Sequence, residues 1–366
     1  MKTIDLIVGA RPNFMKIASL YEAIQNQTSF KEKYNLRLIH TGQHYDEAMS
    51  DTFFSDLNIP IPEINFGVGS GSHAEQTSKI MMAYESLLDN SEWDLCIVVG
   101  DVNSTLACSI VAKKKNILVA HIEAGLRSYD WAMPEEINRI VTDSISDYFF
   151  TTSVNASRNL IKNGISEDSI FFVGNTMIDS LMNNTENIVK PKLFDELLLE
   201  QKKYFLLTLH RPSNVDKEEN LHSLLESICE HCQNYPIIFP THPRTENSLK
   251  NLEVKFQNLR FIPSQSYLEF MFLLSNCFAI LTDSGGITEE STILGVPCLT
   301  IRDNTERPET VDIGTNVLIG TDPKKFGKHF SKLFNNQWKK GNIPEKWDGK
   351  AGVRILKAIE NKILRW

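Results

Sequence analysis

Short apolar runs alternate with segments of helical periodicity along almost the whole chain, and this alternation restricts the fold more than any other feature. It is typical of βαβ units and predicts parallel sheets covered by helices. The alternation is interrupted once, at the polar and weakly periodic residues 183–203, and then restarts. We therefore predict an α/β protein with two Rossmann-like domains. The predicted strands are residues 4–8, 37–41, 95–99, 119–122 and 148–151 in the first half, and 204–209, 237–240, 259–262, 278–282 and 298–301 in the second.

Helices are predicted between these strands from apolar residues spaced three and four apart. Ser153 has the position of a helix N-cap, and Gly164 that of the glycine just beyond the helix end. The other predicted helices are residues 13–27, a segment with Met49, Phe53 and Leu57 on one face, a segment around 80–88, and residues 218–232, 267–276 and 353–364.

Composition excludes several classes of function. The 366 residues suit two domains, and a net charge of −8 argues against nucleic-acid binding, which needs a basic face. No apolar run approaches the roughly 20 residues of a membrane span, and the first residues resemble a strand rather than a signal peptide. Cys229 and Cys232 form a lone C-x-x-C without the second pair that a zinc site usually needs, so we expect no metal. A reducing, cytoplasmic location fits these features.

Polar residues follow directly after several of the predicted strands. They are Asp101, Glu123, His210, His242 and Asp283. Ligands of open α/β sheets bind outside the carboxyl ends of the strands, so these residues are candidates for a site. Each also has an ordinary structural interpretation: Asp101 could cap the helix predicted at Asn103, and a single histidine is more often structural than catalytic.

Residues 282–290 form the most specific local pattern, with Gly285 and Gly286 between a strand and a helix. Two glycines allow close approach of a ligand, and the helix would present free N–H groups to an anion such as a diphosphate. Glu290, one turn further on, could reach ribose hydroxyls. A tight strand-to-helix turn is the alternative. The first strand lacks a G-x-G-x-x-G and the chain lacks a G-x-x-x-x-G-K-[ST], so neither bound NAD nor ATP hydrolysis is indicated.

A second polar cluster surrounds Pro134, which suits the first turn of a helix. Glu135 and Arg139 are four residues apart and would share a face, so they could form a surface ion pair. The alternative is that Glu135 joins Asp101 and Glu123 as three carboxylates around one sugar. Carboxylates in such a group can act as acid and base.

Together these residues resemble the non-hydrolysing UDP-N-acetylglucosamine 2-epimerases. The matching motifs cover nearly the whole chain: Gly9-Ala10-Arg11-Pro12 with Lys16, residues 40–46, Val99-Gly100-Asp101, residues 121–127 and 133–139, Gly174-Asn175-Thr176, His210-Arg211, His242-Pro243, and residues 282–290 and 302–309. The resemblance implies the GT-B architecture, in which two parallel sheets face a central cleft. It implies an N-terminal domain of residues 1–180 plus the C-terminal helix 350–366, and a UDP-binding domain of residues 181–349.

The implied reaction is reversible C2 epimerisation of UDP-N-acetylglucosamine (UDP-GlcNAc) to UDP-N-acetylmannosamine (UDP-ManNAc). It would proceed by elimination and re-addition of UDP through 2-acetamidoglucal, with no cofactor or metal, and would supply surface polysaccharide synthesis. A homodimer is implied. The implied catalytic residues are Asp101, Glu123, Glu135 and His210. The implied substrate contacts are Arg11, Lys16, Arg139, His242, Ser284, Gly285, Gly286 and Glu290. Gln43 and His242 match parts of an allosteric site, to which His44 could also belong.

Four other functions remain open at this point. A sister epimerase could act on a UDP-linked 2,3-diacetamido uronic acid or deoxy sugar, and a hydrolysing epimerase would release free ManNAc. A glycosyltransferase would need room for an acceptor in place of carboxylates on both faces of the sugar. A binding protein without activity would not need all four catalytic residues. The stretch between Arg127 and Pro134 is shorter than in some members, and residues 68–77 differ from members that have the allosteric site.

Overall fold

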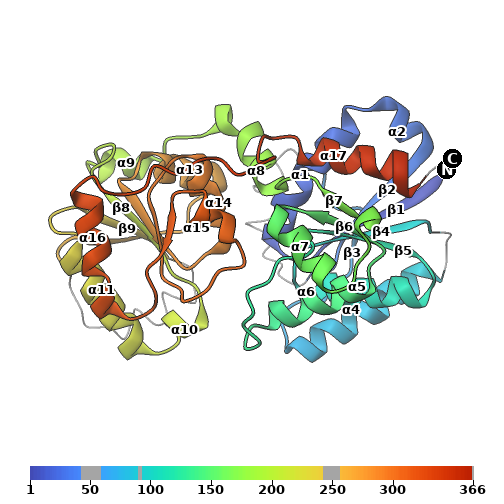
Figure 1. The fold of residues 1–366 in the computed structure, drawn as a ribbon, viewed down its shortest axis with the longest axis horizontal. Helices are drawn as coiled ribbons and strands as arrows, with labels where there is room; N and C mark the ends of the chain where they lie inside the picture. The colour runs from blue at the N-terminus through green and yellow to red at the C-terminus, as the bar shows by residue number, and fades with distance from the viewer. Residues whose placement is uncertain (43–58, 90–92, 242–255, 365–366) are drawn as a thin grey trace. The chain divides into compact units, whose positions relative to one another are not determined.

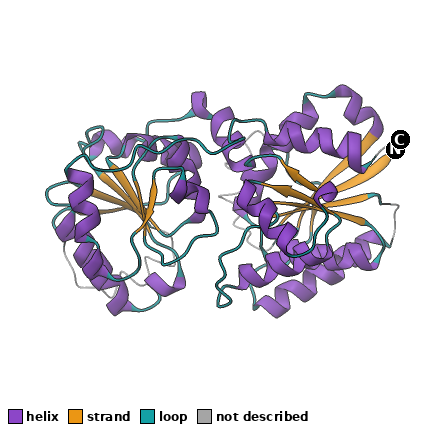
Figure 2. Ribbon diagram, viewed as in Figure 1, coloured by secondary structure: helices purple, strands orange, loops and turns teal. Residues whose placement is uncertain are grey.

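The computed structural model describes residues 1–42, 59–89, 93–241 and 256–364. It divides into two compact units, Met1–Asn183 with Glu345–Trp366, and Asn184–Pro344 (Figure 1). Within the described residues, no helix is both long and apolar enough to cross a membrane. Figure 2 shows that each unit has a central group of strands with helices around it.

The first unit is built on a parallel sheet with the strand order β3-β2-β1-β4-β5-β6-β7. The order reverses direction between β1 and β4, and such a switch point is where open α/β sheets bind ligands. Helices α4, α5 and α6 pack side by side, and α1 packs with α8 and α17 (Figure 1). The strands are β1 Lys2–Val8, β2 Tyr34–His40, β3 Ile64–Asn65, β4 Leu95–Val99, β5 Leu118–Ile122, β6 Tyr148–Thr151 and β7 Ile170–Phe172. The helices are α1 Arg11–Gln25, α2 Thr28–Lys33, α4 His73–Leu88, α5 Asn103–Lys114, α6 Pro134–Ile145, α7 Val154–Lys162, α8 Thr176–Asn183 and α17 Ala351–Ala358.

The second unit repeats this plan with the parallel order β10-β9-β8-β11-β12-β13 and a switch point between β8 and β11. Apolar residues of α11 and α16 join those of the sheet in one buried core. The strands are β8 Phe205–Thr208, β9 Ile237–Pro240, β10 Leu259–Ile262, β11 Ala279–Thr282, β12 Cys298–Thr300 and β13 Asn316–Leu318. The helices are α9 Lys192–Glu196, α10 Pro212–Val215, α11 Glu218–His231, α13 Tyr267–Asn276, α14 Gly285–Ile293, α15 Pro308–Asp312 and α16 Gly327–Phe334.

The predicted class, two α/β units with parallel sheets, is confirmed. The ten predicted strands coincide with β1, β2, β4, β5, β6 and β8–β12 to within a few residues, whereas β3, β7 and β13 were not predicted. Those three have only two or three residues and lie at sheet edges, so they contain too little sequence pattern to be detected. Ser153 caps α7 as predicted, because its side chain accepts a hydrogen bond from Ala156 N. The predicted helix around Met49, Phe53 and Leu57 lies outside the described residues.

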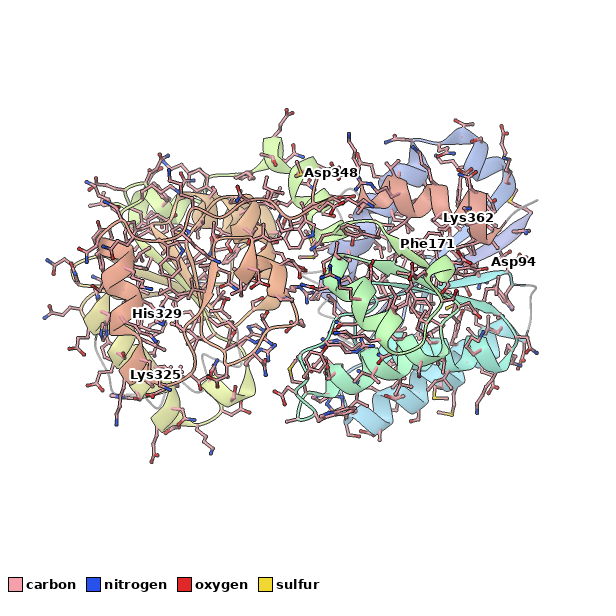
Figure 3. All side chains as sticks on the ribbon, in the orientation of Figure 1. Asp94, Phe171, Lys325, His329, Asp348 and Lys362 are labelled. Carbon is pink, nitrogen blue, oxygen red and sulfur yellow. The ribbon has the colours of Figure 1, made fainter. Side chains whose placement is uncertain are left out.

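The C-terminal segment belongs to the first unit. Helix α17 lies along α1, and Gly352 N donates to the Asp179 carboxylate at 2.8 Å. A Cβ atom on Gly352 would come within 2.5 Å of Ser19 O, so glycine is required for this approach. The buried Trp347 donates through Nε1 to Thr152 O, and Asp348, labelled in Figure 3, forms an ion pair with Arg354.

The buried Asp179 makes the docking of this segment sensitive to pH. Burial raises the pKa of Asp179 to about 6. The folded state therefore holds the proton more tightly than the unfolded state does, and the resulting stabilisation is present below pH ~4 and lost as pH rises through about 6. We expect the wild type to lose about 2–3 kcal/mol of unfolding free energy relative to Asp179→Asn between pH 4 and 7, measured by urea unfolding. The exposed Asp168→Asn in the same unit should parallel the wild type, and a pH-independent difference for Asp179→Asn would contradict the assignment.

Candidate active site

Two sharp turns at the carboxyl ends of β4 and β5 present the acidic side chains of the first unit. Gly100 follows β4 with φ +69°, and Glu123 and Gly125 follow β5 with φ +68° and +79°. A Cβ atom on Gly125 would lie 2.2 Å from Ala156 O. Glu123, unlike these glycines, has a side chain, and its left-handed backbone conformation is strained. Strain of this kind is concentrated at functional sites.

Glu123 is buried beside Lys16 of α1. Its Oε2 forms an ion pair with Lys16 Nζ, and both side chains are at least nine-tenths buried. The lysine comes from the helix that follows β1, and the glutamate follows β5, the neighbour of β4. The predicted site residues Lys16 and Glu123 are thus in contact near the switch point. Arg11 begins α1, and its side chain lies outside the described set.

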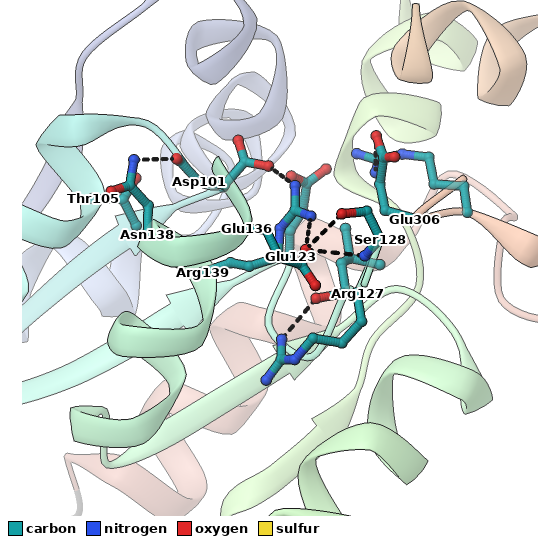
Figure 4. Close-up of polar contacts among 12 residues, drawn as sticks. Asp101, Thr105, Glu123, Arg127, Ser128, Glu136, Asn138, Arg139 and Glu306 are labelled. Atoms are coloured by element: carbon teal, nitrogen blue, oxygen red, sulfur yellow. Dashed lines mark hydrogen bonds and ion pairs between the residues drawn. The ribbon is translucent and has the colours of Figure 1, made fainter. Parts of the chain in front are cut away.

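Asp101 is held by helix α6 (Figure 4). Arg139 Nη2 forms an ion pair with Asp101 Oδ2, and Asn138 Nδ2 donates to Asp101 O at 2.9 Å. The carboxylate keeps 27% of its side-chain surface exposed, so a ligand can reach it. The residue that caps α5 is Val102, so the interpretation of Asp101 as a helix cap is wrong.

Arg139 does not pair with Glu135, as its spacing of four suggested, but with Glu136. Arg139 Nη1 lies 2.5 Å from Glu136 Oε2, and Glu136 also accepts from the backbone N–H groups of Ser128 and Tyr129 (Figure 4). Glu136 is buried, whereas Glu135 is partly exposed and has no hydrogen bond or ion pair with any described residue. The spacing of Glu136, Arg139 and Asp143 by three and four along one helix face is the signal that could have identified this polar face.

In the second unit, His210 follows β8 and Asp283 follows the neighbouring strand β11. His210 Nδ1 lies 2.8 Å from Asp283 Oδ1. Burial alone would raise the pKa of Asp283, but hydrogen bonds from His210, Arg211 and Asn214 outweigh it and hold that pKa below its ordinary value. The carboxylate therefore accepts a hydrogen bond from the Nδ1–H group of His210, whose side chain is 57% exposed. Sequence reasoning noted Asp283 only as a strand-end residue and gave it no role.

Helix α14 begins directly after Asp283, with Ser284 as its N-cap and Gly285 and Gly286 in its first turn. Free N–H groups at this position can bind an anion. A buried cation lies nearby: a Cβ atom on Gly285 would be 3.9 Å from Arg302 Nη1. Arg302 Nη2 donates to Glu306 at 2.6 Å, while its Nε and Nη1 have no hydrogen-bond partner among the described residues. Arg302 is thus a further candidate anion ligand that sequence reasoning did not identify.

Glu290 lies inside α14 and is buried. Burial raises its pKa to about 8, the nearby Tyr267 hydroxyl lowers it, and the neighbouring Glu289 charge raises it. Glu289 in turn is paired with Arg307 Nε at 2.5 Å. A carboxyl with this pKa is largely protonated at neutral pH and can donate as well as accept hydrogen bonds.

The remaining residues singled out in the sequence are two histidines with a glutamine and the cysteine pair. Gln43, His44 and His242 lie outside the described residues. Cys229 and Cys232 are free and buried, and burial raises the pKa of Cys229 to about 12, so it is a thiol at neutral pH. Over the described ranges, no cluster of three or more His, Cys, Asp or Glu side chains is placed to bind a metal ion.

Comparison with known proteins gives a consistent result. The family described as UDP-N-acetylglucosamine 2-epimerase matches residues 26–360. The UDP-N-acetylglucosamine 2-epimerase of Methanocaldococcus jannaschii is 43% identical, with 97% of this chain and 98% of that protein covered. A UDP-2,3-diacetamido-2,3-dideoxy-D-glucuronate 2-epimerase of Pseudomonas aeruginosa is 39% identical over 86% of this chain and 87% of its own.

A crystal structure of the M. jannaschii UDP-GlcNAc 2-epimerase in complex with UDP-GlcNAc and UDP has the same fold. It superimposes with a TM-score of 0.86 at 42% identity and covers 97% of this chain and 99% of its own. The match to the family and the identity to its members extend over nearly the full length of both chains. The chain is an epimerase and belongs to the UDP-N-acetylglucosamine 2-epimerase family.

Proposed function

We propose that this enzyme interconverts UDP-GlcNAc and UDP-ManNAc by inverting C2, with the first unit acting on the sugar and the second binding UDP. The observation that supports this most strongly is the placement of two carboxylates, Asp101 and Glu123, after the adjacent strands β4 and β5. Each is paired with a cation, Arg139 or Lys16. The second unit contributes His210 and the start of α14, which are groups suited to a diphosphate.

The proposed reaction is an elimination followed by an addition. A basic side chain removes the C2 proton, the C1–O bond breaks, and UDP leaves with the bonding electron pair, which gives 2-acetamidoglucal. A proton is then delivered to the opposite face of C2 while UDP re-adds at C1. The C2 proton is weakly acidic, so cleavage of the C1–O bond must be more advanced than removal of the C2 proton. Positive charge therefore develops on the sugar ring. Carboxylates stabilise this charge, and one of them acts as the base.

Departure of UDP requires positive groups near the diphosphate. His210, Arg302 and the N–H groups of Ser284, Gly285 and Gly286 are the candidates within the second unit. The end of strand β11 positions both His210 and the start of α14. Asp283, which follows β11, holds His210 and comes just before Ser284, the N-cap of α14. Preorganised donors of this kind stabilise a leaving group without reorganisation during the reaction.

A second candidate substrate is a UDP-linked 2,3-diacetamido uronic acid, because a relative named for that substrate is 39% identical. The same carboxylates would serve, since the reaction at C2 is the same. Parallel assays with both nucleotide sugars separate the two proposals: we expect kcat/KM to be higher for UDP-GlcNAc. The cytoplasmic location, the homodimer and the supply of a surface polysaccharide are further parts of the proposal, and size-exclusion chromatography with light scattering tests the dimer.

Incubation with UDP-GlcNAc in deuterated water tests the reaction directly. We expect deuterium at C2 and the appearance of UDP-ManNAc, because the proton removed from one face exchanges with solvent before reprotonation. Proton NMR of the C2 signal measures both. Free ManNAc would indicate a hydrolysing enzyme, and absence of exchange would contradict the proposal for this substrate.

Substitution of the four proposed catalytic residues should abolish turnover while the fold is retained. We expect Asp101→Asn, Glu123→Gln, Glu135→Gln and His210→Ala each to lower kcat by at least about 10²-fold, the usual contribution of an acid–base group. Exposed Glu167→Gln is the matched control and should keep full activity. Thermal unfolding checks the fold, and a fully active Glu135→Gln would refute the three-carboxylate arrangement.

Asp283→Asn should impair His210 without removing it. The asparagine side chain has one acceptor oxygen, so it cannot accept hydrogen bonds from both His210 Nδ1–H and the backbone N–H groups as the carboxylate does. His210 therefore loses its fixed orientation. We expect kcat to fall by about 10–100-fold with UDP affinity changed by less than about threefold. Steady-state kinetics and UDP titration measure this, with exposed Asp303→Asn as control. Wild-type kcat in Asp283→Asn would be incompatible with this role.

A further inference from the structure

His121 is a fully buried histidine in β5, and both of its ring nitrogens have partners. Nε2 lies 2.8 Å from Gly100 O, and Nδ1 lies 2.8 Å from Asp143 Oδ1. Its side chain is 0% exposed. Neither sequence pattern nor the proposed reaction assigns a role to this residue.

The two partners determine which nitrogens bear protons. Gly100 O is a carbonyl oxygen and can only accept, so Nε2 must donate. Asp143 Oδ2 accepts from Arg127 Nη1 at 2.6 Å and from Gly125 N at 3.1 Å. Both oxygens of a carboxylate accept hydrogen bonds, so Asp143 Oδ1 is the acceptor for His121, and Nδ1 must donate as well. A histidine that donates from both nitrogens is an imidazolium.

These contacts join the two turns that present the acidic residues. Gly100 directly precedes Asp101, and Gly125, which Asp143 holds, follows Glu123 by two residues. Gly100 also lies against the Lys16–Glu123 pair: a Cβ atom on it would be 3.1 Å from Lys16 Nζ and 3.5 Å from Glu123 Oε2. Both turns have left-handed backbone conformations, and that of the non-glycine residue Glu123 needs support from neighbouring groups.

We propose that His121 is a positioning residue: an imidazolium whose two ring N–H groups fix the Gly100–Asp101 turn directly and the Glu123–Gly125 turn through Asp143. The proposal rests on the proposed function, because Asp101 and Glu123 are the residues that it positions. His121 and Arg127 contribute two positive charges against the one negative charge of Asp143.

His40 provides an internal comparison. It ends β2 in the same sheet and is also buried, with 2% of its surface exposed. Burial lowers the pKa of His40 to about 4. His40 is therefore neutral at pH 7, whereas the two acceptors beside His121 require a hydrogen on each of its ring nitrogens.

Nitrogen NMR of the wild-type enzyme labelled with ¹⁵N-histidine tests the charge without reference to activity. His121 is assigned from the signals that disappear in His121→Gln, and His40 from those lost in His40→Gln. At pH 7 we expect two protonated nitrogens for His121, each coupled to a slowly exchanging proton, and one for His40. A His121 ring with one unprotonated nitrogen overturns the proposal. This result stands even if the enzyme acts on a different sugar.

Kinetics test the positioning role. His121→Gln can replace the bond to Gly100 or that to Asp143 but not both, and Asp143→Asn removes the carboxylate. We expect either change to lower kcat by about 10–100-fold with KM changed by less than about threefold, because displacement of a catalytic group costs turnover and the proposed UDP site is in the other unit. The matched control is Asp147→Asn, which loses a carboxylate that anchors Val119 N at the opposite end of β5 and should keep kcat. Wild-type kcat in a folded His121→Gln, or equal kcat losses in the Asp143 and Asp147 variants, would overturn the proposal.

Discussion

The site of the first unit depends on the ion pairs and hydrogen bonds that the buried polar face of helix α6 makes. Arg139 bridges Asp101 and Glu136, Asn138 holds the Asp101 backbone, and Asp143 holds the turn after β5. Buried charges are costly unless each has a well-placed partner, so removal of one leaves another uncompensated. The arrangement therefore fixes the positions of the acidic residues more rigidly than loops alone would.

Each unit places its candidate residues where its strand order reverses. In the first unit the reversal lies between β1 and β4, beside Lys16, Asp101 and Glu123; in the second it lies between β8 and β11, beside His210 and Asp283. The two sheets provide different chemistry at equivalent places. The first presents carboxylates paired with cations, and the second presents a histidine, a helix start and a buried arginine. This division is what an elimination from a nucleotide sugar requires, since positive charge develops on the sugar and negative charge on the leaving diphosphate.

The fold and the strand-end residues could be predicted because they depend on local pattern. Apolar runs define the strands, and the residue after each run must lie at the carboxyl end of its strand. The partners of those residues could not be predicted, because they come from elsewhere in the chain. Arg139 pairs with Asp101, which lies 38 residues earlier in the chain. Likewise, Asp283 meets His210 only because β8 and β11 are neighbours in the sheet.

The central claim is that the bond between C1 and the diphosphate breaks and reforms during each inversion of C2. Positional isotope exchange measures this directly, with UDP-GlcNAc that has ¹⁸O in the bridge between C1 and the β-phosphorus. If UDP departs and re-adds, the label moves from the bridging to the non-bridging β-phosphate positions at a rate comparable to C2 exchange, and ³¹P NMR detects the shift. Inversion at C2 with the label retained in the bridge would contradict the account, because the proton would then have been exchanged without loss of UDP.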